Sequence, residues 1–72
     1  MKWVKTKKQL PENDDKVLAL IRTKNKDFKY YEMGYYKNGN WWNDMIGKLE
    51  HDGVDNDYFF VSHWMPLPKM PK

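Results

Sequence analysis

The chain has 72 residues, a net charge of +3 and no cysteine. This length supplies one small domain, near the lower limit at which a hydrophobic core stabilises itself unaided. The lack of cysteine excludes disulfides and thiolate metal sites, and no apolar run reaches the roughly 18 residues that a membrane span needs. We therefore expect a single soluble, cytoplasmic domain over residues 1–72, with no bound cofactor and no membrane partner.

The aromatic content predicts strands. Four Trp, five Tyr and three Phe stand in this short chain, and such rings favour strands and bury large areas. The N-terminal lysines are Lys2, Lys5, Lys7 and Lys8. Solvated lysines are the ordinary surface of a small soluble protein, so this cluster is only weak evidence for nucleic-acid binding.

The first half of the chain predicts a central strand followed by a second strand. Pro11 favours an extended chain at Leu10, and 12–15 is a polar turn cluster. The unbroken apolar run Val17–Ile21 predicts a central strand buried on both faces, although its periodicity also permits a short helix. After a hairpin loop at 23–27, alternation over 28–37 predicts a strand with Tyr31, Met33 and Tyr35 on one face and Phe28, Tyr30, Glu32 and Tyr36 on the other.

Two glycines, Gly34 and Gly39, indicate local backbone features in the middle of the chain. Gly34 interrupts the second strand, which indicates a bulge or a close backbone approach. Asn38-Gly39 predicts a type I′ hairpin turn, in which both residues need positive φ. A strand over 40–46 follows, with Trp41 and Met45 on the face opposite to Trp42 and Ile46.

The last third of the chain predicts a loop and a closing strand. Residues 47–57 carry two glycines and several acids, and we expect an exposed acidic loop. A strand over 58–65 places Phe59, Val61, His63 and Met65 on one face and Tyr58, Phe60, Ser62 and Trp64 on the other. Pro66, Pro68 and Pro71 then end the pairing.

These elements predict a mainly β fold, a small antiparallel sheet of about four strands. Only one face of such a sheet is packed by the chain's own segments, so rings on the other face are available to a partner. The candidate partner-binding residues are Tyr31, Tyr35, Trp41 and Trp42. A protein partner or self-association fits better than base stacking, because few cations interleave with the rings.

Two polar constellations lack the pattern of a catalytic or metal site. His51, Asp52, Asp55 and Asp57 follow neither EF-hand nor zinc spacing, so a solvated loop is favoured. His63 has the pKa range of a general base, but strand alternation points Ser62 to the opposite face. We therefore interpret His63 as structural and expect a protein that is not an enzyme.

The stretch "HWMPLP" at 63–68 has two possible roles. Trp64 and Met65 can fill core space while an extended proline-rich segment packs on the N-terminal segment around Trp3 and Leu10-Pro11. Alternatively, "PLPKMP" is a proline-rich docking ligand. The first role is favoured, because the segment follows directly from a strand.

These motifs carry a family resemblance. An early tryptophan, "LPE", the apolar "KVLALI" and a terminal "VSHWMPLP" resemble a phage- and prophage-associated family called domain of unknown function 551. The residues that match its signature are Trp3, Leu10, Pro11, His63, Trp64, Met65, Pro66, Leu67 and Pro68. The chain departs from the family at Ser62, where threonine is commoner, and over 48–58, which is longer than usual.

The resemblance implies a small β-rich accessory protein of mobile-element origin and supplies no activity. The favoured function is therefore a non-enzymatic protein-interaction module, with host takeover or anti-defence as possible settings. The alternative is a nucleic-acid-associated protein that uses the basic N-terminus and exposed aromatics.

Overall fold

The computed structural model describes residues 2–12, 15–25, 28–53 and 57–67. In these ranges the chain forms strands and turns, and it contains no helix with the length and apolar character needed to cross a bilayer. The strands are β1 (Val4–Lys5), β2 (Val17–Thr23), β3 (Lys29–Lys37), β4 (Asn40–Asn43), β5 (Gly47–Lys48), β6 (His51–Asp52) and β7 (Tyr58–Pro66). Residues 13–14, 26–27 and 54–56, which belong to the predicted turns and loops, lie outside the described residues, as do Pro68 and Pro71.

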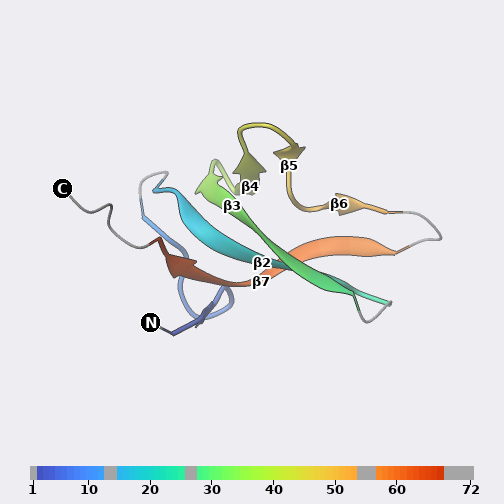
Figure 1. Cartoon of the computed structure of the whole chain (residues 1–72), viewed down its shortest axis with the longest axis horizontal. Coiled ribbons are helices and arrows are strands. Elements are labelled where there is room, and N and C mark those ends of the chain that lie inside the picture. The colour runs from blue at the N-terminus through green and yellow to red at the C-terminus, as the bar shows by residue number, and fades with distance from the viewer. Residues whose placement is uncertain (1, 13–14, 26–27, 54–56, 68–72) are drawn as a thin grey trace.

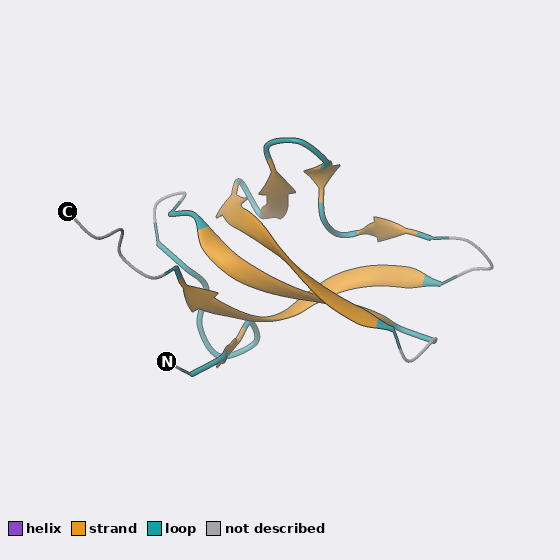
Figure 2. Cartoon of the chain, in the orientation of Figure 1, coloured by secondary structure: helices purple, strands orange, loops and turns teal. Residues whose placement is uncertain are grey.

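The strands form one antiparallel sheet in the order β1-β7-β2-β3-β4-β5, and β6 also pairs with β7 (Figures 1 and 2). The predicted mainly β antiparallel fold is confirmed. The predicted count of about four strands is too low by three, because β1, β5 and β6 have two residues each. Pairs this short carry no alternation that a sequence pattern can detect.

Strand β2 lies at the centre of the sheet, between β7 and β3. Its side chains at Val17, Ala19 and Ile21 are 3%, 0% and 0% exposed. Leu18 and Leu20 are only half-buried. The predicted central position is therefore confirmed, whereas complete burial on both faces is wrong.

The β3–β4 hairpin has the predicted turn. Asn38 and Gly39 have φ values of 52° and 80°, as a type I′ turn requires. Strand β4 ends at Asn43 rather than at residue 46, because the Asn43 Oδ1 atom accepts hydrogen bonds from the Met45 and Ile46 amides and fixes a turn there.

Gly34 lies where two parts of the chain approach closely. A Cβ atom at this position would lie 2.8 Å from Leu49 Cδ1 and 3.0 Å from the Trp42 carbonyl oxygen. The pairing of β3 with β2 shows no shift from Lys29 to Gly34, where it ends. Of the two predicted explanations for this glycine, close approach is therefore the one observed.

The sheet curls because its two sides are joined by a short link. β5 pairs with β4 and β6 pairs with β7, yet only Leu49 and Glu50 separate β5 from β6. Three Cα–Cα steps span about 11 Å at most, so the edge at β5 must come close to β7. Figure 1 shows this link descending from β5 to β6 beside β7. The concave inner face thereby encloses the core.

The described residues of the segment 47–57 therefore do not form the predicted exposed loop, and residues 54–56 lie outside the described part. It contributes β5 and β6, and Leu49 is 1% exposed within the core. Asp57 is 4% exposed, and its Oδ1 atom accepts hydrogen bonds from the amides of Asn25 (2.8 Å) and Tyr58 (2.9 Å). This carboxylate thus connects Asn25, after β2, to the start of β7.

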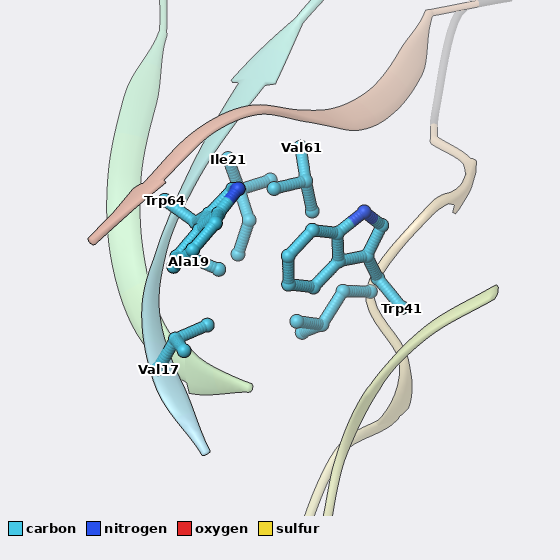
Figure 3. Packing of buried hydrophobic residues seen from close by; sticks show 7 residues of the cluster. Val17, Ala19, Ile21, Trp41, Val61 and Trp64 are labelled. Carbon is cyan, nitrogen blue, oxygen red and sulfur yellow. The ribbon is translucent and has the colours of Figure 1, made fainter. Parts of the chain in front are cut away.

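A β-bulge at Ser62 changes the predicted faces of β7. Leu20 pairs with His63 and Ile21 pairs with Val61, which leaves Ser62 as the extra residue. Both Val61 and Trp64 consequently point into the core, where Figure 3 shows them beside Ala19 and Trp41. The predicted alternation, which put Val61 and Trp64 on opposite faces, is wrong for this reason.

The C-terminal part of β7 packs against the N-terminal segment, but through residues 61–64 rather than through the predicted proline-rich segment that follows them. Val4 pairs with Trp64 through β1, and the Trp64 Nε1 atom donates a hydrogen bond of 2.9 Å to the Gln9 carbonyl. The Thr6 amide donates to the Ser62 carbonyl at 3.0 Å, and the Thr6 hydroxyl donates to the Val61 carbonyl at 3.0 Å. The N-terminal segment is therefore joined to β7 through main-chain, hydroxyl and indole hydrogen bonds.

Candidate functional site

The convex side of the three long strands forms an apolar surface, which we call the outer face. Residues paired across antiparallel strands point to the same side of a sheet. Because Val17, Ala19 and Ile21 point inward, Leu18, Leu20 and Arg22 point outward together with their partners. The rows from β7 through β2 to β3 are Met65–Leu18–Met33, His63–Leu20–Tyr31 and Phe60–Arg22–Lys29.

The outer face remains open to solvent. Tyr31 is 64% exposed and Met33 is 48% exposed. The other apolar positions in its rows are half-buried, since none of them falls in the fully buried core. No described segment covers this face, so two rows of apolar side chains remain accessible.

The surface continues across β4. Tyr35 pairs with Trp42, which places both rings on the outer side. The Trp42 Nε1 atom donates a hydrogen bond of 3.0 Å to the Lys37 carbonyl, and this bond fixes the indole along the hairpin. The outer face therefore combines a centre of leucine and methionine with tryptophan and tyrosine at its side.

The turn after β4 adds two exposed apolar side chains. Met45 is 95% exposed and Ile46 is 53% exposed. Asn43 holds this turn, since its Nδ2 atom donates to the Met33 carbonyl at 2.6 Å while its Oδ1 atom accepts from the Met45 and Ile46 amides at 2.8 and 2.9 Å. A side chain that bonds both the turn and β3 presents Met45 and Ile46 in a defined position.

An ion pair closes the end of this surface. The Lys16 Nζ atom lies 2.5 Å from Asp44 Oδ2, and both side chains are more than half exposed. Their hydrogen bond, and then their mutual attraction, raises the pKa of Lys16 and lowers the pKa of Asp44. A cavity of about 300 Å³ lies beside this pair, with Met33, Tyr35 and Met45 in its wall.

The charge on the outward side of the three long strands has one sign. The outward positions of β2, β3 and β7 carry Arg22, Lys29 and Lys37 and no carboxylate among the described residues. Lys5 of β1 adds a further cation, because it pairs with His63. The apolar centre is thus flanked by cations.

The four predicted partner-binding aromatics fall in two places. Tyr31, Tyr35 and Trp42 lie on the outer face. Trp41 is 2% exposed and belongs to the core, so its predicted exposure is wrong. Sequence reasoning also missed the outward positions of Leu18 and Leu20, which it placed in a strand buried on both faces, and that of Met65, to which it gave a core-filling role. What identifies these three residues is the strand register, in which Leu18 pairs with Met33 and Met65 and Leu20 pairs with Tyr31. Local sequence patterns do not reveal this register.

His63 and Ser62 are closer than alternation predicts. The bulge brings the Ser62 hydroxyl oxygen to 2.8 Å from His63 Nδ1, so the expectation that Ser62 points away is wrong. A nucleophile–base pair also needs a group that orients the base. Among the described residues no carboxylate is hydrogen-bonded to the His63 ring.

The acidic segment does not form a metal centre in the part of the chain that the structure describes, where no three metal-ligating side chains cluster. Asp55 lies outside that part. The His51 ring lies next to the Phe59 ring in a tilted arrangement, with centroids 5.0 Å apart, and its Nδ1 atom lies 3.0 Å from the Asp52 carbonyl oxygen. Its contacts are therefore with the sheet.

Comparison with protein-family models assigns the chain to a family. A family model described as "Protein of unknown function (DUF551)" matches residues 2–72. The chain belongs to this family. Neither the search of curated proteins nor the search of solved structures returned a match. Membership in DUF551 therefore identifies the family of the chain but does not indicate an activity.

Leu10-Pro11 and Pro66-Leu67, from the two proline-containing motifs of this DUF551 chain, line one groove. This groove, which we call the motif groove, has a volume of about 400 Å³. It is lined by Gln9, Leu10, Pro11, Glu12, Asp15, Lys16, Val17, Trp64, Pro66 and Leu67. Trp3 is 40% exposed and precedes β1, outside the groove lining. Met65 and His63 point to the outer face instead, and Pro68 lies outside the described residues.

Proposed function

We propose that this DUF551 protein is a non-catalytic protein-interaction module that binds a protein partner through its outer face. The observation that supports the proposal is the open double row of Leu18 and Leu20 with Met33, Met65 and Tyr31. Contiguous apolar patches of this kind mark interaction sites on soluble proteins. Methionine and aromatic residues are enriched in interface centres, and methionine adapts to irregular partners.

The setting of this module is part of the proposal. The resemblance to phage-associated proteins supports a role as an accessory protein that acts on a host component, such as host takeover or anti-defence. The cysteine-free composition agrees with the reducing cytoplasm. Self-association through the same face is the simplest competing use of the surface.

A second candidate function is binding of single-stranded nucleic acid. It is favoured by the cations Arg22, Lys29 and Lys5 around Tyr31 and Phe60, with no carboxylate on the outward positions of the three long strands. Lys2, Lys7 and Lys8 are exposed as well. The centre of the surface is nevertheless aliphatic, and base stacking uses rings. A protein partner therefore fits better.

A pull-down from host lysate, with and without nuclease, tests the proposal. We expect the tagged protein to retain a discrete partner after nuclease treatment and Tyr31→Ser to lose it. Phe28→Ser is the matched control, because Phe28 is a 55% exposed aromatic at the β2–β3 hairpin rather than in the outer rows. Equal capture by both variants would contradict the assignment to the outer face.

Two further measurements separate the alternatives. Sedimentation velocity over a wide concentration range detects self-association, which Tyr31→Ser would weaken if the outer face joined two copies. Fluorescence anisotropy with a labelled oligothymidine at several salt concentrations detects phosphate binding, whose affinity falls steeply as salt rises. Nuclease-sensitive capture together with such a salt dependence would replace the protein partner with nucleic acid.

A further inference from the structure

The motif groove is a second surface with its own chemistry. It lies between the segment 10–12 and the end of β7, whereas the rows of the outer face lie on the convex side of the sheet. Leu10 is 39% exposed, and Leu67 is half-buried at the opposite wall. Trp64 and Val17 close the floor, since both are buried in the core. The groove therefore offers an apolar floor that is shaped by main chain and prolines.

Trp64 fixes one end of this floor. Its Nε1 atom donates to the Gln9 carbonyl at 2.9 Å, so the indole is held by the same segment that carries Leu10 and Pro11. The Gln9 amide in turn donates to the Lys5 carbonyl at 3.1 Å. These bonds hold the two sides of the groove together before any ligand arrives, which reduces the ordering that binding requires.

Two carboxylates lie on one rim. The Asp15 amide donates to the Glu12 carbonyl at 3.0 Å, and this turn brings both exposed side chains to the groove. Lys16 also lines the groove, but its ammonium pairs with Asp44 at 2.5 Å. Because that charge is matched by Asp44, Glu12 and Asp15 leave the rim negative.

We infer that the motif groove binds an extended segment of a partner protein that carries arginine or lysine next to an apolar side chain. The apolar side chain occupies the floor over Trp64, and the cation lies against Glu12 and Asp15. The inference goes beyond the outer-face proposal, because it names a separate site with opposite charge. A groove ligand and an outer-face partner can be one protein or two.

Titration of the ¹⁵N-labelled protein with acetyl-Leu-Arg-amide, followed by NMR, tests the inference. The Trp64 indole N–H is the reporter, since it lies at the floor of the groove. Acetyl-Leu-citrulline-amide is the matched neutral peptide, because citrulline keeps the shape of arginine and removes its charge. We expect saturable movement of the Trp64 resonance and binding of the arginine peptide about fivefold tighter than that of the citrulline peptide, as exposed ion pairs allow.

Charge-removing variants test which carboxylates cause the preference for the arginine peptide. Glu12→Gln combined with Asp15→Asn should abolish the preference for arginine and leave weak binding of both peptides. Asp52→Asn, an exposed acid on β6 away from the groove, should retain it. Because these are exposed positions, we expect all three substitutions to preserve the fold, and the dispersion of the same spectra checks this.

The result that would overturn the inference is a Trp64 resonance that stays in place, or that moves equally with both peptides. Movement on raising the protein concentration without peptide would assign the groove to a second copy and would also overturn it. Failure here leaves the outer-face proposal intact, because that proposal is tested by Tyr31→Ser rather than by groove variants.

Discussion

Ile21 and Leu20 are neighbours in β2 with side chains of equal size, yet they have different surroundings. Ile21 is fully buried in the core, whereas Leu20 is half-buried between Tyr31 and His63. The apolar run that contains them therefore serves two surfaces. One surface is closed by the curled sheet, and the other is left open by folding. The hydrophobic content of β2 exceeds what the core of this small protein covers.

The largest expected effect concerns the inner face. Trp64→Ala should lower the free energy of unfolding by about 3–5 kcal/mol, since it removes a buried indole. That is a large part of the about 5–15 kcal/mol typical of a folded domain. Chemical denaturation measures it, and Trp42→Ala on the outer side should cost clearly less. Equal losses would mean that the two faces do not differ energetically.

The pair Ile21→Ala and Leu20→Ala tests the comparison within a single strand. Ile21→Ala should cost about 2–5 kcal/mol, because it leaves a cavity in the core. Leu20→Ala should cost about 1 kcal/mol, because part of this side chain is already in contact with water. Denaturant midpoints of the two variants provide the measurement. A larger loss at Leu20 would show that a further segment covers the outer face.

Crowding on the inner face gives a smaller effect. Gly34→Ala places a methyl group 2.8 Å from Leu49 Cδ1 and 3.0 Å from the Trp42 carbonyl, and overpacking of this kind costs about 1–3 kcal/mol. Thermal unfolding measures the loss. Combining it with Leu49→Val should cost less than the sum of the two single changes. Strict additivity would argue against contact between the two positions.

The smallest effect is electrostatic. The pKa of Asp44 is lowered in the folded state, so its contribution to stability is present above the unfolded pKa of about 3.9 and disappears as pH falls through the folded value. Asp44→Asn should therefore lower the Tm near neutral pH and have no effect in strong acid. Added salt should reduce the difference, because both partners are exposed. A difference in Tm that does not vary with pH would contradict this.

Local signals predicted some elements correctly. The Asn38-Gly39 turn depends on backbone preferences of two residues, and the central position of β2 follows from five consecutive apolar residues. The burial of Trp64 was also predicted, whereas its contact with the N-terminal segment is made by β7 itself and not by the prolines that follow. These features need little knowledge of distant partners.

Features set by pairing were not predictable. The bulge at Ser62 exists because β7 shifts register against Leu20 and Ile21, and it alone explains why Val61 and Trp64 share the core. Leu49 is buried because the link between β5 and β6 brings the edge of the curled sheet close to β7. For the same reason the sequence indicated an exposed aromatic face but assigned Trp41 to it, since alternation separates Trp41 from Trp42 without telling which points inward.

The contacts of Glu50 and Thr6 with β7 have a consequence for solubility. The Val61 amide donates to Glu50 Oε2 at 2.9 Å, and Thr6 bonds the carbonyls of Val61 and Ser62. These contacts occupy the stretch of the β7 edge that lies between β1 and β6. An open edge recruits strands from other molecules and starts aggregation, and charge, bulges and bound side chains block that route. The protein can therefore keep an apolar sheet face exposed while this edge is closed to unwanted strand addition.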